Sequence, residues 1–197
     1  MSRMSGHDEI TPVSSGTRLT YDDFVLFPED GQRHELIDGE HYVTATPNTS
    51  HQTIVGNLYY LIRCYIEAHP IGKIFGVPVD VIVSRFDVVE PDLQYISNAR
   101  APELLSGDWV TGAPDLVVEI ASKSTRKRDN TIKYKLYERI DVLEYWTIDP
   151  ETEVVRVHRK AGQKFGDAIE LALDRGDVLT SPIFPGLQLR LADIFKD

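Results

Sequence analysis

Two stretches of the chain carry acidic residues where buried strands are expected. "EPDLQYIS" (residues 90–97) and "APDLVVEIASKST" (residues 113–125) both contain Pro-Asp-Leu near their start. Because side chains alternate along a strand, Asp115 and Glu119 share one face of the second stretch. Neighbouring strands lie about 4.8 Å apart, so Asp92 of the first stretch and Glu119 are close enough to hold one cation. The pattern predicts metal binding by paired carboxylates.

The carboxylates differ in how readily a structural role explains them. Asp92 and Asp115 follow a proline, where a carboxylate can cap backbone N–H groups at the start of a strand. Glu119 lies in mid-strand among Val and Ile, where an ionised carboxylate is costly unless it is paired or bound to a metal. Glu119 is therefore the strongest indication of a site.

A helix predicted over residues 125–140 supplies a cation. At about 100° per residue, Lys133 falls on the arc of the apolar residues, and Asp129 shares this arc. An ammonium group that faces the core needs an anion. Two alternatives stay open: the long side chain reaches water past the core, or Lys133 pairs with Asp129 alone.

Two carboxylates on adjacent strands with a lysine aimed at them suit metal-dependent phosphodiester hydrolysis. Mg²⁺ held by Asp92 and Glu119 would lower the pKa of a bound water, and the cation and the lysine would offset charge on phosphorus. We expect Mg²⁺ as the cofactor, with Mn²⁺ as the alternative. Lys123 shares strand parity with Glu119 and is the alternative to Lys133, although we expect it beyond the end of the strand.

The surrounding elements follow from periodicity and turn signals. Asp38-Gly39 predicts a hairpin, and the apolar spacing after His51 predicts a long core helix. A strand–helix–strand unit over residues 116–148 indicates a mixed α/β sheet flanked by helices, with added antiparallel strands after Pro150. Residues 1–16 are predicted to be a flexible tail, and residues 17–197 a single domain.

The net charge of -10 argues against a surface that binds nucleic acid throughout. The segment "KSTRKRDNTIKYK" is locally basic, and Arg126, Lys127 and Arg128 are its candidate nucleic-acid contacts; a solvated helix face is the alternative. No apolar run approaches the roughly 18 residues of a membrane span. With a single cysteine, Cys64, the chain is expected to be cytoplasmic.

Six segments in order carry a family resemblance: "HELIDGE", "SHQTIVGNL", "PDLQYI", "PDLVVEIASKST", "RDNTIKYKLYERIDVLEYWTIDP" and "SPIFPGLQLRLADIF". Together, over about residues 18–195, they resemble the Uma-two family of putative restriction endonucleases, a branch of the PD-(D/E)XK nuclease superfamily. The resemblance implies a restriction-endonuclease-like core and a metal-dependent DNA endonuclease. Expected partners are DNA and a second copy of the chain in a homodimer; no membrane partner is expected.

The resemblance also implies roles for individual residues. Asp92 matches the motif aspartate, Glu119 the motif glutamate, and Glu35 the glutamate of the N-terminal element. Ala121 departs from the parent pattern, which has a lysine there, and Lys133 matches the family's relocated lysine. By position alone, Glu35 would be an ordinary exposed charge in a hairpin strand.

Three further residues have both a functional and a structural interpretation. His51 matches a recurrent family His-Gln, but a surface or capping role is the alternative. Tyr145 and Trp146 are expected in the core rather than as platforms for base stacking. A function of a different class also stays open, a non-catalytic nuclease-fold protein that binds nucleic acid or a protein partner.

Overall fold

The computed structural model describes residues 18–44, 46–76, 79–105, 107–122 and 125–196. The predicted tail over residues 1–16 and the candidate Lys123 lie outside these residues. The helices are α1 (Tyr21–Phe24), α2 (Thr49–Ala68), α3 (Ala101–Leu104), α4 (Arg126–Arg128), the π-helix η1 (Asp129–Lys133), α5 (Tyr134–Arg139), the 3-10 helix η2 (Leu173–Arg175) and α6 (Leu191–Ile194). The strands are β1 (Arg33–Ile37), β2 (Glu40–Thr44), β3 (Gly72–Phe75), β4 (Val81–Ser84), β5 (Asp87–Val89), β6 (Leu93–Ser97), β7 (Val110–Thr111), β8 (Leu116–Ile120), β9 (Glu144–Asp149), β10 (Val154–Ala161), β11 (Lys164–Phe165), β12 (Ile169–Ala172), β13 (Val178–Leu179) and β14 (Leu189–Arg190).

The main sheet has the order β11-β10-β9-β8-β6-β3, with β12 paired to β10. Strands β8 and β9 are parallel, as the predicted strand–helix–strand unit requires, and β6 runs antiparallel to β8. The strands β10 and β12 are the predicted antiparallel additions after Pro150. The mixed sheet predicted from the sequence is therefore confirmed.

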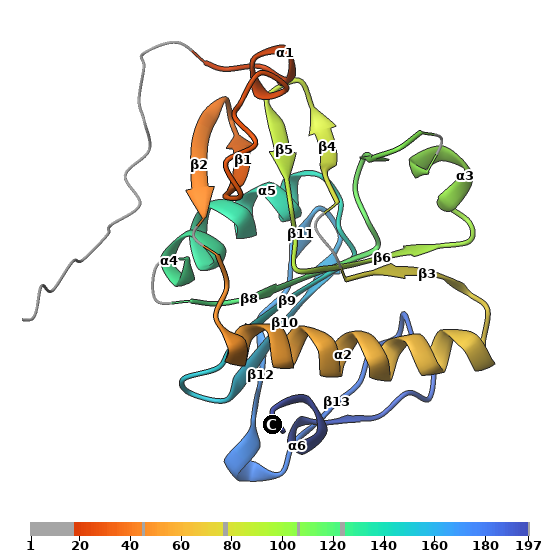
Figure 1. Cartoon of the computed structure of the whole chain (residues 1–197). Coiled ribbons are helices and arrows are strands. Elements are labelled where there is room, and N and C mark those ends of the chain that lie inside the picture. Colours follow the sequence, from red (N-terminus) through yellow and green to blue (C-terminus); the bar gives the residue numbers. More distant parts are fainter. Residues whose placement is uncertain (1–17, 45, 77–78, 106, 123–124, 197) are drawn as a thin grey trace, which may run out of the picture.

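A second, smaller sheet has the order β2-β1-β5-β4-β7. The hairpin of β1 and β2 turns at Asp38 and Gly39, whose φ angles of 53° and 77° suit the tight turn predicted there. The small sheet lies with α4 and α5 on one side of the main sheet, while α2 covers the other side (Figure 1). Residues on β1 can therefore reach the same face of the main sheet as α4 and α5.

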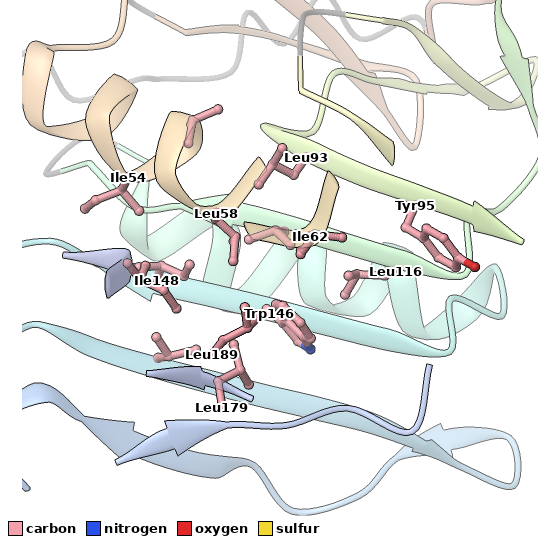
Figure 2. Close-up of a cluster of buried hydrophobic side chains, with 14 of the residues drawn as sticks. Ile54, Leu58, Ile62, Leu93, Tyr95, Leu116, Trp146, Ile148, Leu179 and Leu189 are labelled. Atoms are coloured by element: carbon pink, nitrogen blue, oxygen red, sulfur yellow. The ribbon is translucent and has the colours of Figure 1, made fainter. Parts of the chain in front are cut away.

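The two faces of the main sheet carry separate hydrophobic cores. Leu116, Val118 and Ile120 of β8 pack against α2, in the core that Figure 2 shows. Val117, on the opposite face of β8, packs in a second core with Tyr137 of α5. The predicted alternation of β8 is confirmed, and Glu119 lies on the same face as Val117.

The helix predicted over residues 125–140 is interrupted by a π-helical turn. Residues Asp129–Lys133 form η1 between α4 and α5, so the regular α-helix predicted from the sequence is corrected at this point. A π-turn is wider than an α-turn and is frequently found at functional sites. Both ends of η1 are buried polar residues, Asp129 and Lys133, so the wide turn directs two charged side chains toward the sheet.

None of the described helices is long and apolar enough to cross a membrane.

Candidate active site

Asp92 and Glu119 lie next to each other on adjacent strands. The register pairs Leu93 of β6 with Val118 of β8, and its continuation by one residue places Asp92 opposite Glu119. Both side chains are buried, with 8% and 4% of their residue surface exposed. The structure thus brings together the two carboxylates that the sequence predicted as a pair.

Lys133 lies between two glutamates. Its Nζ is 2.7 Å from Oε1 of Glu119 and 2.7 Å from Oε1 of Glu35, and its side chain is 2% exposed. The side chain therefore points inward, as the helical arc predicted. The alternatives, a lysine that reaches water or one that pairs with Asp129 alone, do not hold.

Glu35 belongs to this cluster because β1 crosses above the main sheet. Its Oε1 also accepts a hydrogen bond from the backbone N–H of Glu90, 3.1 Å away. Its Oε2 lies 3.2 Å from Nη2 of Arg128, and that same nitrogen donates to Oγ1 of Thr44. Glu35 is 1% exposed and is not the ordinary exposed hairpin charge that its sequence position suggested. The small sheet buries it.

A buried tyrosine completes the contacts of Glu119. The hydroxyl of Tyr137 donates to Oε1 of Glu119 over 2.8 Å, the same oxygen that accepts from Lys133. The other carboxylate oxygen, Oε2, takes part in neither bond. Burial, followed by the charge of Glu119, raises the pKa of Tyr137 well above its usual value, so the hydroxyl keeps its proton and remains a donor.

Asp92 is held by three donors. Its Oδ1 accepts from Nη1 of Arg33 over 2.8 Å, and its Oδ2 accepts from the backbone N–H of Ile120 over 2.8 Å. Nε2 of His51, in the first turn of α2, lies 3.1 Å from Oδ2. His51 is thus neither a surface residue nor merely part of the helix start, where Asn48 supplies the capping side chain.

The repeated Pro-Asp-Leu has one structural function at both ends of the β6–β8 pair. Asp92 precedes β6 and accepts the N–H of Ile120 at the end of β8, and Asp115 precedes β8 and accepts the N–H of Ser97 at the end of β6, over 2.6 Å. Each aspartate therefore ties the start of its own strand to the end of the antiparallel partner. Among the residues that the structure describes, Arg100 is the one further charged contact of Asp115, at 3.6 Å, and Asp115 lies outside the cluster around Lys133.

The buried carboxylates divide into two classes by pKa. Burial opposes ionisation of Glu35, but the charges of Lys133 and Arg128 outweigh it and lower the pKa. Burial likewise opposes ionisation of Asp92, whose pKa is held below its usual range by the His51 hydrogen bond and the charge of Arg33. Burial raises the pKa of Glu119 to about 8 in spite of Lys133. The pKa values of the two glutamates differ because both contact Lys133 but only Glu35 also contacts Arg128.

Carboxylates outnumber cations within the cluster. Asp129, 2% exposed, adds another acid, and burial raises its pKa to about 6 against the charges of Lys133 and Arg128. The acids are Glu35, Asp92, Glu119 and Asp129; the cations are Arg33, Arg128 and Lys133. With all four acids ionised, the cluster would carry a surplus of negative charge, and the raised pKa of Glu119 shows that this ionisation is opposed, so the site suits a further cation.

The donor set narrows the kind of metal. Within the described ranges, no three His, Cys, Asp or Glu side chains are grouped so as to hold a metal ion. Mg²⁺ commonly binds through one or two carboxylates and keeps several waters, whereas zinc needs three or four protein ligands. Asp92 and Glu119 therefore fit Mg²⁺ better than they fit zinc.

Two of the three basic residues predicted to contact nucleic acid, Arg126 and Arg128, form ion pairs within the chain. Nη2 of Arg126 lies 3.0 Å from Asp149 and 2.7 Å from Glu151, and Arg128 is buried beside Glu35. Only Lys127 of the three has an exposed side chain. The structure therefore separates the cluster into an ion-paired arginine, an exposed lysine and a residue of the buried site. Tyr145 and Trp146 are fully buried, as predicted for core strand residues.

Sequence reasoning missed Arg33, Arg128 as a partner of Glu35, and Tyr137. Arg33 and Glu35 occupy alternate positions of β1, and both contact the cluster although they are far from it in sequence. Tyr137 lies four residues after Lys133, and residues with this spacing are neighbours on one face of a helix. This spacing is the feature of the sequence that could have placed Tyr137 beside Lys133. No comparable signal in the sequence pairs Arg33 with Asp92.

Comparisons with known proteins agree with this fold. The sequence matches the Uma2 family, described as "Putative restriction endonuclease", over residues 21–192. The fold is similar to a crystal structure from Anabaena variabilis described as a putative nuclease belonging to DUF820, with a TM-score of 0.76 and 21% identity, over 90% of this chain and 97% of that one. No curated protein matches. The predicted mixed, restriction-endonuclease-like fold is thus confirmed, and because the family match spans most of its length, the chain belongs to the Uma2 family.

Proposed function

We propose that this protein is a metal-dependent nuclease that hydrolyses phosphodiester bonds of DNA, with its active site at Asp92, Glu119, Lys133 and Glu35. The observation that carries the proposal is the burial of Lys133 between two glutamates, with Asp92 directly across the strand pair. A stable core has little use for this arrangement, because buried ion pairs often contribute no more stability than well-packed apolar residues. The family description supports the reaction class.

Lys133 is the electrophilic group in this proposal. Its ammonium is fixed by Glu35 and Glu119, and the charges of these glutamates outweigh burial and raise its pKa, so it is protonated at neutral pH. A fixed cation in a buried site stabilises negative charge that develops on a phosphoryl oxygen, without reorganisation during the reaction. Glu35 is a positioning residue, since it holds the lysine and is itself held by Arg128.

Asp92 and Glu119 would hold the metal. Bound Mg²⁺, or Mn²⁺ in its place, would supply Lewis-acid activation of water and charge neutralisation at phosphorus. The chain's own contribution is to hold both carboxylates in place. Arg33, His51 and the N–H of Ile120 fix Asp92, and Tyr137 fixes Glu119 through Oε1.

A second candidate function is binding without cleavage. The observations that favour it are the net charge of -10 and the engagement of Arg126 and Arg128 in contacts within the chain. A nuclease fold does not by itself imply catalysis. Completeness of the site favours cleavage, because the two acids and the lysine are all present and meet in one place.

Cleavage of DNA by purified variants tests the proposal. We expect the wild type to cut DNA with Mg²⁺ or Mn²⁺ and not with EDTA, and Asp92→Asn and Glu119→Gln to abolish cleavage while remaining folded. Glu103→Gln, an exposed acid on α3, is the matched control and should cut like the wild type. Equal cleavage by Glu119→Gln and the wild type would contradict the proposed site. Binding of DNA without cleavage under every metal condition would favour the second function.

A further inference from the structure

A pocket lies beside the candidate active site on the same face of the main sheet. Its volume is about 280 Å³, and its lining is Lys73, Phe75, Val79, Leu105, Gly107, Asp108, Trp109 and Val110. The alternation of β3 sends Ile74 into the α2 core, so Lys73 and Phe75 lie on the opposite face, which is the face of Glu119. The proposed reaction uses none of these residues.

Strand geometry places the pocket close to Asp92. Phe75 is paired with Gln94 of β6, and Gln94 is two residues beyond Asp92 on the same side of that strand. One strand spacing and two residues along a strand amount to roughly 8 Å between the Cα atoms of Asp92 and Phe75. A group in the pocket could therefore belong to the same nucleic-acid strand as a phosphate at the active site.

Gln94 forms the boundary between the two regions. Its Nε2 donates to the carbonyl of Val79, a pocket residue, over 3.3 Å. Its Oε1 is buried and has no hydrogen-bond partner among the described residues, although Gln94 is only 1% exposed. Buried acceptors are normally paired, so Oε1 of Gln94 can accept a hydrogen bond from a group bound beside Val79 and the pocket.

The lining has the chemistry of a nucleobase site. Trp109 is 48% exposed, a large fraction for a tryptophan in a pocket wall, and Phe75 provides a second aromatic ring. Bases stack on such rings whatever their sequence. Lys73 supplies a cation for a phosphate, and Asp108 supplies an acceptor for an amino group of a base. Aromatic rings with one charge of each sign match a nucleotide better than they match an apolar ligand.

We propose that this pocket binds a single unpaired nucleobase next to the phosphate that is cleaved, with Trp109 as the stacking residue. The inference rests on the proposed function, and it narrows the substrate to DNA that presents an unstacked base, either single-stranded or extruded from a duplex. Trp146, the other tryptophan, is fully buried and hydrogen-bonded to Glu144, so only Trp109 can report directly on a ligand.

Tryptophan fluorescence in EDTA tests the pocket without any cleavage. A short single-stranded oligonucleotide should quench Trp109, and an abasic oligonucleotide of equal length and charge should bind on the order of 10-fold more weakly. By anisotropy of the labelled strands, Trp109→Leu should lose this discrimination and Trp109→Phe should keep it. Tyr60→Leu, which removes an exposed aromatic residue of α2, is the matched control and should bind like the wild type.

Each failure has a distinct signature. Equal binding of the two oligonucleotides, no binding of either, or unchanged discrimination in Trp109→Leu would overturn the pocket assignment, even if Mg²⁺-dependent cleavage occurs. Quenching with full discrimination, but no cleavage under any metal condition, would support the pocket and contradict the proposed nuclease.

Discussion

At the scale of residues, the site depends on two glutamates that share one lysine. Glu35 has Arg128 as an additional cation and is the ionised member, while Glu119 has a raised pKa. Burial raises the pKa of Glu119, and the charges of Asp92, Asp129 and Glu35 add to this effect, so a divalent cation bound beside Glu119 would favour its ionised form. Because a carboxylate must lose its proton to bind a metal, Mg²⁺ affinity should increase with pH up to about 8.

The raised pKa of Glu119 predicts how stability depends on pH. The pKa of this carboxyl is near 4.5 in the unfolded chain and is raised by burial to about 8 in the folded one, so between these values the folded protein binds the extra proton. The contribution of this group to the free energy of unfolding is therefore full below pH 4.5 and is lost as the pH rises through about 8.

Urea unfolding of Glu119→Gln without metal measures that contribution. The free energy of unfolding of the variant should fall less than that of the wild type between pH 5 and pH 8, because glutamine has no proton to lose. Asp129, whose pKa is raised to about 6, contributes in the same direction in both proteins. Parallel curves for wild type and variant would show that Glu119 is ionised throughout.

At the scale of elements, the β6–β8 pair is closed by an aspartate at each end. Asp92 and Asp115 make the same cross-strand contact, to the N–H groups of Ile120 and Ser97. They differ in their other partners: Asp92 also contacts Arg33 and His51 and faces Glu119, whereas Asp115 faces the end remote from Lys133. The aspartate of each Pro-Asp-Leu motif thus holds the strand pair together, but only Asp92 also lies in the candidate active site.

Replacing each aspartate by alanine separates these functions. Both Asp115→Ala and Asp92→Ala should lose about 1–3 kcal/mol of stability, because each leaves a backbone donor unpaired. Only Asp92→Ala should also lose cleavage. Chemical denaturation and a cleavage assay on the same preparations provide the comparison. Loss of activity in a folded Asp115→Ala protein would mean that Asp115 also belongs to the active site.

At the scale of the whole molecule, the net charge of -10 confines any nucleic-acid contact to local patches. Lys127 is exposed, whereas Arg126 is ion-paired with Asp149 and Glu151 and Arg128 belongs to the buried site. The three adjacent basic residues should therefore behave differently in DNA binding.

Salt titration of DNA binding distinguishes the three. Lys127→Gln should reduce the slope of log affinity against log salt by about one ion-equivalent. Arg128→Gln should leave the slope unchanged and lower stability, because it removes a partner of the buried Glu35. An unchanged slope in Lys127→Gln would place the nucleic-acid surface elsewhere.

Local patterns in the sequence predicted much of this fold. The alternation of β8 and the inward side of Lys133 follow from periods of 2 and about 3.6 residues. The hairpin follows from the Asp38-Gly39 turn signal, and the paired strands from the repeated Pro-Asp-Leu. The burial of Glu35 and the contact of Arg33 with Asp92 could not be predicted this way. They arise because the small sheet packs over the main one, and no periodicity within β1 encodes that packing.

We predict that the buried Lys133 acts in catalysis and is not only part of a structural ion pair. Single-turnover cleavage at saturating Mg²⁺ tests it with three variants: Lys133→Met, Lys123→Met and, as the matched control, Lys135→Met, an exposed lysine of α5. Loss of one fixed donor to the transition state typically lowers the rate about 10²- to 10³-fold. We predict a loss of that size in Lys133→Met with Mg²⁺ binding largely kept, a much smaller loss in Lys123→Met, and none in Lys135→Met. A folded Lys133→Met protein that cleaves at the wild-type rate, while Lys123→Met is inactive, would show that Lys123 and not Lys133 is the catalytic lysine.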